Sequence, residues 1–118
     1  MPKITAIVND LNFMTKIRNA AEALGVKVGF VGSKEQLEHY LKESDLIFID
    51  LENDFIEPVA LIERIKSDRA MQKIRLIGYL SHVNAPLKWQ AADAGCDEVL
   101  SRFEFNSNIK EILQTACL

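Results

Sequence analysis

The run Leu46-Ile47-Phe48-Ile49, followed at once by Asp50, is the most apolar stretch of the chain and decides the fold. Four consecutive apolar residues of this kind are typical of a strand that is buried on both faces of a sheet. Sheets of parallel strands are the ones that bury both faces in this way. The run therefore predicts a central parallel strand that ends abruptly in a carboxylate.

Four other short apolar runs predict further strands, at 4–8, 26–30, 74–80 and 98–100. Helical patterns separate the runs, and such alternation is typical of an α/β fold with helices on both faces of the sheet. Right-handed crossovers limit the possible strand orders. We favour the order 2-1-3-4-5, because it puts the alternating second strand and the short fifth strand at the edges and the most apolar strands in the middle. We expect one α/β domain over 1–118, with a doubly wound, five-stranded parallel sheet.

The helices are predicted from apolar spacing and from the residues at their ends. Ser33 and Gln36 form a capping box, in which each side chain should accept a hydrogen bond from the other residue's N–H. Pro58 and Pro86 suit the first turns of two later helices. The first helix is expected to bury Leu11, Met14, Ile17, Ala21 and Leu24, and the last one Ile109, Ile112, Leu113 and Ala116.

Composition excludes several classes of protein. Of the 118 residues, 48% are hydrophobic and 26% are charged, which suits one folded domain. No stretch approaches the roughly 20 apolar residues of a membrane helix, and the start turns acidic too soon for a signal peptide, so we expect a cytoplasmic protein. A net charge of −3 gives no reason to expect direct binding of nucleic acid. Cys96 and Cys117 are expected to be reduced thiols.

Polar residues follow four of the predicted strands: Asn9-Asp10, Asp50, Ser81-His82 and Ser101-Arg102. In the expected order these strand ends are neighbours, so the side chains should meet in one crevice, where ligands of such folds bind. Oxygen ligands of this kind favour Mg²⁺, and a carboxylate beside Mg²⁺ can attack phosphorus. A hydroxyl and a guanidinium could then hold the phosphoryl oxygens.

This ordered set of residues resembles the receiver domain of two-component response regulators, which is a CheY-like fold. The resemblance covers nearly all of the chain and implies that Asp50 is the phosphoacceptor. It also implies that Asp10 binds the metal beside Asn9, with Asp50 and the backbone carbonyl of Glu52 as further ligands. Ser81 matches the family's hydroxyl, and Arg102 stands where the family has lysine. The stretch Ala94-Gly95-Cys96-Asp97-Glu98 resembles the approach to the family's fifth strand.

The resemblance implies a signalling module, either stand-alone or part of a longer regulator. A histidine kinase or a phosphotransfer protein would supply the phosphoryl group, with Mg²⁺ as cofactor. The output protein would bind the face made by the fourth helix, fifth strand and fifth helix, and a homodimer is a further arrangement that the family allows. Catalysis would be limited to self-phosphorylation and autodephosphorylation at Asp50.

Departures from the family pattern favour an alternative, a phosphorylation-independent interaction module on the same fold. Asn9 replaces one acid of the metal site, and Glu52 adds a carboxylate. Arg102 has a wider, planar head than lysine, so the exchange is not conservative at a tight site. Phe103 replaces the proline that follows in the family, which predicts a different loop, and Val99 replaces the switching aromatic residue.

Several of these candidate residues could instead have a purely structural role. Asp10 could simply cap the first helix, and Arg102 could be an ordinary surface charge. Trp89, Phe103 and Phe105 could belong to the core or, if exposed, mark a partner surface. His82 has only His39 as a possible imidazole partner, so zinc is not expected. A flavin carrier is disfavoured because the loop over 9–13 is acidic and would repel phosphate.

Overall fold

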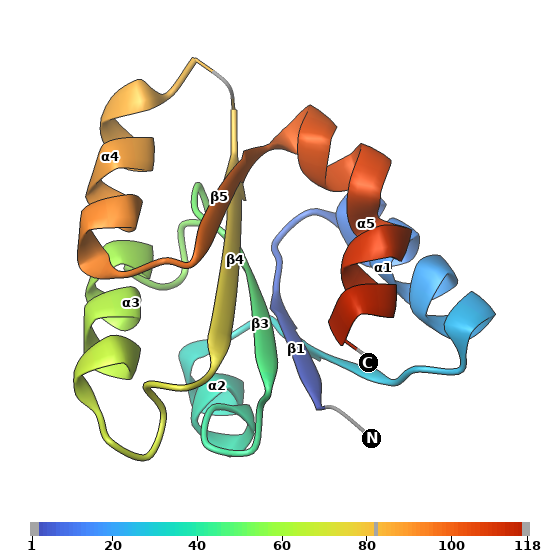
Figure 1. Cartoon of the computed structure of the whole chain (residues 1–118), viewed down its shortest axis with the longest axis horizontal. Helices are drawn as coiled ribbons and strands as arrows, with labels where there is room; N and C mark the ends of the chain where they lie inside the picture. The colour runs from blue at the N-terminus through green and yellow to red at the C-terminus, as the bar shows by residue number, and fades with distance from the viewer. Residues whose placement is uncertain (1–2, 82, 117–118) are drawn as a thin grey trace.

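Five parallel strands and five helices alternate in the computed structural model, which describes residues 3–81 and 83–116 (Figure 1). The strand order is β2-β1-β3-β4-β5, which confirms the predicted doubly wound sheet. The strands are β1 Ile4–Ile7, β2 Val28–Val31, β3 Leu46–Asp50, β4 Arg75–Leu80 and β5 Glu98–Ser101. The helices are α1 Leu11–Leu24, α2 Lys34–Tyr40, α3 Pro58–Ser67, α4 Ala85–Ala94 and α5 Arg102–Ala116.

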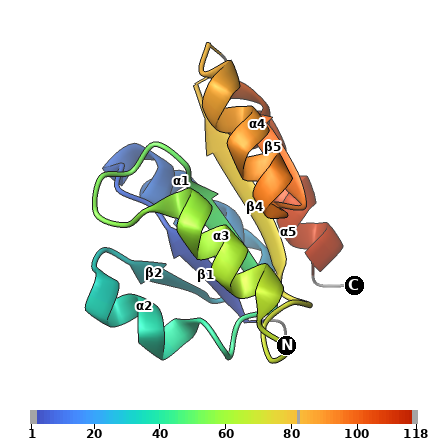
Figure 2. The ribbon, with the colours of Figure 1, turned by 90° about the vertical axis from the view of Figure 1, so that its left-hand side faces the viewer.

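Helices cover both faces of the sheet in two unequal layers. Helices α1 and α5 lie side by side on one face, and α2, α3 and α4 cover the other, as Figures 1 and 2 show. The central strand β3 alternates between these layers: Leu46 and Phe48 join the core under α1 and α5, whereas Ile47 and Ile49 join the core under the other three helices. This alternation places the Asp50 side chain on the α1 and α5 face. No helix within the described residues is long and apolar enough to cross a membrane.

The helix ends agree in part with their predicted signals. Gly25 ends α1 in the left-handed conformation at φ 70°, which suits a residue without a Cβ atom. The Gln36 N–H donates to the Ser33 Oγ at 3.3 Å, as a capping box requires. The Gln36 Oε1, however, accepts from the Gly32 N–H at 2.8 Å, so the reciprocal bond of the predicted box is replaced by one to the preceding glycine.

Helix α1 buries most of the predicted apolar face, with Ile17 and Ala21 buried and Met14 and Leu24 packed against the core, but not Leu11. Leu11 is 77% exposed, whereas Phe13 is buried together with Ile17 and Ala21. Helical spacing accounts for the difference, because Phe13, Ile17 and Ala21 lie four residues apart on one face, whereas Leu11 is only two residues from Phe13 and faces another way. The prediction that Leu11 faces the core is therefore wrong.

Helix α5 begins directly after β5, without a connecting loop. Arg102 is thus its first residue, and the helix starts seven residues earlier than the apolar spacing from Ile109 indicates. In this first turn Phe103 is 78% exposed, but Phe105 is fully buried against the sheet. Cys96 is buried as expected, whereas Cys117 lies outside the described residues.

Candidate functional site

The ends of strands β1, β3, β4 and β5 meet at one edge of the sheet, as predicted. Ile7 pairs with Ile49, Asp50 with Tyr79, and Leu80 with Ser101, so the residues that follow these pairs are neighbours. In Figure 1 this edge lies at the top, where β4 and β5 end. The expected site residues Asp10, Asp50, Glu52 and Arg102 are brought together there.

Asp50 is a buried carboxylate, with only 3% of the residue exposed. Its Oδ1 accepts a hydrogen bond from the Glu52 N–H at 2.9 Å, and its carbonyl accepts one from the side chain of buried Asn53 at 2.6 Å. Burial raises the pKa of Asp50 above its ordinary value, although the Glu52 N–H and Arg102 partly oppose this effect. The site therefore holds the Asp50 carboxyl at a fixed position, where burial disfavours its charged form.

Asp10 both caps a helix and faces the site. Its Oδ1 accepts from the Asn12 N–H at 2.7 Å, which confirms the structural explanation that it caps α1. Its Oδ2 lies 3.8 Å from an Arg102 nitrogen, so the same carboxylate also belongs to the cluster. The neighbouring Asn9 donates to Asp54 Oδ1 at 3.1 Å, and is thus tied to the loop after β3.

Glu52 links the loop after β3 to the loop after β4 through its side chain. Its Oε1 accepts from the Ser81 N–H at 2.7 Å, and its Oε2 from the Asn84 side chain at 3.3 Å. Burial opposes ionisation of Glu52, but the hydrogen bonds from the Ser81 N–H, Asn84 and Arg102 outweigh it and lower the pKa of this carboxyl. The expected roles of the Ser81 hydroxyl and of the Glu52 backbone carbonyl stay predictions.

Arg102 contacts all three carboxylates at once. Its Nη1 lies 3.8 Å from Asp10 Oδ2, its Nη2 lies 3.5 Å from Asp50 Oδ1, and its Nε lies 3.4 Å from Glu52 Oε1. Only 34% of the side chain is exposed, so Arg102 is not an ordinary surface charge. Each guanidinium nitrogen therefore faces a different acid, which a lysine ammonium could not reproduce in the same geometry.

Two aromatic rings also lie next to the guanidinium. The Arg102 Cζ lies 5.5 Å from the ring centroids of both Phe13 and Tyr79. These two rings stack on each other at 4.8 Å, and Phe105 stacks on Tyr79 at 4.6 Å. A cation over aromatic faces is attracted by their electron density, so the rings help to hold Arg102 in place.

The Tyr79 hydroxyl is buried without a hydrogen-bond partner among the described residues. Burial raises the pKa of this phenol strongly, and the Asp50 charge adds to the effect. An unsatisfied buried hydroxyl costs stability, so Tyr79→Phe should raise the free energy of unfolding by about 1 kcal/mol while keeping the ring stack. Urea unfolding followed by circular dichroism would measure this, with the half-exposed Tyr40→Phe as control. A loss of stability in Tyr79→Phe would contradict the expectation.

The donor atoms are oxygens, yet the residues do not fit a divalent cation. Within the described part of the chain, no three Asp, Glu, His or Cys side chains gather in a way that could hold a metal ion. The Asp10 Oδ1 is engaged as a helix cap, and both Glu52 side-chain oxygens accept hydrogen bonds. The cation that these carboxylates contact is Arg102.

Sequence reasoning missed several contributors to the site. Asn84 and Asn53 hold the two loops, and Phe13 and Tyr79 flank Arg102. An asparagine three residues after a strand-ending carboxylate is a weak turn signal that could have indicated Asn53. The sequence does not indicate that the two aromatic residues belong to the site, because they cannot be distinguished there from other residues of the core. His82 lies outside the described residues.

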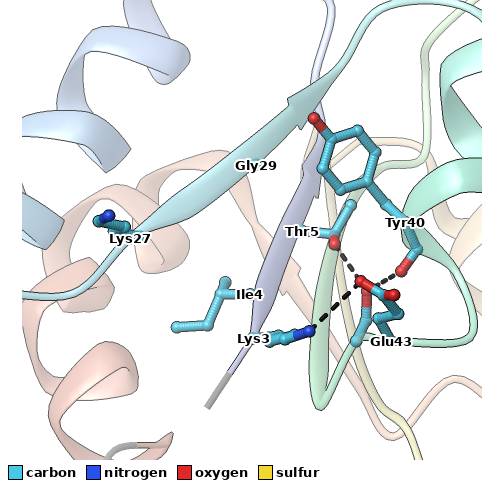
Figure 3. Close-up of a pocket in the computed structure, with 8 residues that line it drawn as sticks. Lys3, Ile4, Thr5, Lys27, Gly29, Tyr40 and Glu43 are labelled. Atoms are coloured by element: carbon cyan, nitrogen blue, oxygen red, sulfur yellow. Dashed lines mark hydrogen bonds and ion pairs between the residues drawn. The ribbon is translucent and has the colours of Figure 1, made fainter. Parts of the chain in front are cut away.

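A separate cavity of about 440 Å³ lies at the opposite end of the sheet, beside the amino ends of β1 and β2 (Figure 3). The Thr5 hydroxyl pairs with the Ser44 hydroxyl at 2.6 Å, and Ser44 donates to the Tyr40 carbonyl at 2.6 Å. Lys3 pairs with Glu43 at its rim at 3.3 Å. These polar groups pair with one another, and the cavity lies apart from the acidic cluster.

No family model and no curated protein sequence matches the chain. Solved structures do match it along nearly its whole length. The phosphorylated cyanobacterial phytochrome response regulator RcpA is 17% identical with a TM-score of 0.83, and the match covers 98% of this chain and 94% of that one. The chemotaxis response regulator CheY4 of Vibrio cholerae is 11% identical with a TM-score of 0.80, and 98% of each chain is covered.

A third match carries a metal ion. The receiver domain of sensor histidine kinase PA1611 from Pseudomonas aeruginosa PAO1, solved with magnesium in its active site cleft, is 16% identical with a TM-score of 0.79. The match covers 97% of this chain and 95% of that one. All three matched structures are response regulators or receiver domains. The similarity to this chain is one of fold. The chain therefore has the CheY-like fold of the receiver domains of two-component signalling.

Proposed function

We propose that the chain is a signalling module that accepts a phosphoryl group on Asp50 and passes the signal on by contact with another protein. One observation carries the proposal: a buried carboxylate ends the central strand and lies 3.5 Å from a guanidinium nitrogen. A guanidinium next to an anionic nucleophile can stabilise the charge of the transferred phosphoryl oxygens. The receiver fold supports this reading, because one matched structure is described as a phosphorylated response regulator.

The proposed reaction is a displacement at phosphorus. An Asp50 carboxylate oxygen forms a bond to phosphorus while the phosphorus–nitrogen bond of a phosphohistidine donor breaks. The electron pair stays on the imidazole nitrogen, and the product is an acyl phosphate on Asp50. Arg102 would bind the phosphoryl oxygens, and Ser81, directly after β4, would supply a hydroxyl to them. Such a module is not an enzyme in the ordinary sense, since its only reactions are gain and loss of its own phosphoryl group.

The partners that we propose are a phosphodonor and an output protein. The donor would be a histidine kinase or a phosphotransfer protein. The output surface would be the face formed by α4, β5 and α5, where two aromatic side chains are exposed: Trp89 by 67% and Phe103 by 78%. Exposed aromatic side chains are frequent anchors of protein contacts. The same surface could also join two copies of the chain.

A second candidate function has its own support. All three carboxylates already contact Arg102. In addition, Val99 stands half-buried in β5 where the family has a switching aromatic residue. Both features favour an interaction module that binds its partner without phosphorylation. Such a module would use the same α4, β5 and α5 surface, and Asp50→Asn would leave its partner binding unchanged.

Phosphorylation can be tested by intact-protein mass spectrometry after incubation with acetyl phosphate, with and without Mg²⁺. We expect wild type to gain the mass of one phosphoryl group, which alkaline hydroxylamine removes, because acyl phosphates react with this reagent. Asp50→Asn should gain none. Asp54→Asn, which changes an exposed acid in the same loop, should behave like wild type. An unmodified wild type in both conditions, or an equal adduct on Asp50→Asn, would exclude Asp50 as the acceptor and leave the second candidate.

A further inference from the structure

The charge balance of the acidic cluster leads to an inference about metal binding. Three carboxylates converge on the guanidinium of Arg102, each one facing a different nitrogen at 3.4–3.8 Å. They come from the loop after β1, from the end of β3 and from the loop after β3. A single positively charged side chain of α5 therefore lies among three acids and contacts each of them.

A second observation shows that aromatic rings hold Arg102 as well. The ring centroids of Phe13 and Tyr79 both lie 5.5 Å from the Arg102 Cζ. Tyr79 is fully buried and Phe13 nearly so, and both rings belong to one aromatic stack with Phe105. Because acids and rings confine the guanidinium together, it cannot leave the cluster without losing both sets of contacts.

We propose that Arg102 is a built-in cation that takes the place of a divalent metal at this site. A divalent ion bound to Asp10 and Asp50 would lie next to the guanidinium, and like charges at such separations repel strongly in a partly buried setting. Asn9 adds to the effect, because it contributes no charge and donates its amide to Asp54. The site of this chain therefore disfavours Mg²⁺ and Mn²⁺, independently of whether Asp50 accepts a phosphoryl group.

Titration with Mn²⁺, followed by the electron paramagnetic resonance of the free ion, tests the inference without a phosphoryl donor. We expect wild type to bind Mn²⁺ weakly and with the same affinity as Asp10→Asn, because the cluster is not used. Arg102→Met should bind at least about tenfold more tightly, since the repulsion is gone and the carboxylates remain. Adding Asp10→Asn to Arg102→Met should remove this gain and so locate the ion.

Arg18→Met is the matched control, because Arg18 also lies over an aromatic ring, at 5.3 Å from the Phe30 centroid. It should bind Mn²⁺ like wild type. Thermal melting gives a second measurement: Mn²⁺ should raise the melting temperature of Arg102→Met but not of wild type. Tight binding by wild type that Asp10→Asn abolishes would overturn the inference, even if Arg102→Met failed to fold. So would a folded Arg102→Met that binds no better than wild type.

Discussion

Replacing Phe105 with alanine should reduce the free energy of unfolding by about 3–5 kcal/mol, the range for a large aromatic residue removed from a core. Phe105 is fully buried. Its ring stacks on Tyr79 at 4.6 Å and meets Phe48 edge-on at 5.2 Å, so its loss leaves a cavity between α5 and the sheet. Urea unfolding followed by far-ultraviolet circular dichroism would measure the change.

Phe103→Ala is the control for this prediction. The two phenylalanines lie two residues apart in the first turns of α5, but Phe103 is 78% exposed. Its replacement should change the free energy of unfolding by no more than about 0.5 kcal/mol. Similar losses in the two variants would show that α5 does not dock as described, and would weaken the position assigned to Arg102 at its start.

The fold could be predicted from the sequence because its strands carry a strong local signal. The run from Leu46 to Ile49 has no polar residue that could face water, so it had to be a central strand. The order of the strands was chosen from those that crossover handedness allows, because it puts the least apolar strands at the edges. The meeting of Asp10, Asp50 and Arg102 followed from that order. Residues distant in sequence were therefore brought together by topology alone.

The details of the site depend on how individual side chains are oriented, which the sequence pattern does not predict. Leu11 and Phe13 are both apolar but lie two residues apart on α1, so they cannot share a face, and Phe13 is the one that is buried. The Glu52 side chain reaches the loop after β4, a contact that the sequence did not predict, and the expected role of its backbone carbonyl stays a prediction. Arg102 was placed at the end of a strand, whereas it opens a helix. Such differences depend on how the helices and strands pack together, and the spacing of apolar residues does not predict this packing.

Buried aromatic packing and surface charge are coupled in this molecule. The stack of Phe13, Tyr79 and Phe105 is part of the core, yet two of its rings, Phe13 and Tyr79, contact the guanidinium that the acids surround. A substitution in the core under α5 is therefore expected to loosen Arg102 as well. Conversely, a change at Arg102 should reduce stability as well as alter the chemistry of the cluster.

Arg102→Met should reduce the free energy of unfolding by about 2 kcal/mol at neutral pH. The methionine keeps the apolar stem but leaves Asp10, Asp50 and Glu52 to repel one another. Removing one partner of a fully buried ion pair costs about 3–5 kcal/mol. The expected loss is smaller because solvent screens a side chain that is 34% exposed. Arg102→Lys, which keeps the charge, should recover part of the loss, and Arg18→Met should show none.

The pH dependence separates this charge effect from lost packing. Burial already raises the pKa of Asp50 in the folded state, and Arg102 opposes that rise, so Arg102→Met should raise the pKa further. A carboxyl with a raised folded pKa adds stability at low pH that is lost as the pH rises through that value. The deficit of Arg102→Met should therefore be smallest near about pH 4, close to the pKa of an unfolded aspartate, and grow toward neutrality. Urea unfolding at a series of pH values would measure it, and a deficit that stays constant with pH would mean that Arg102 acts through packing alone.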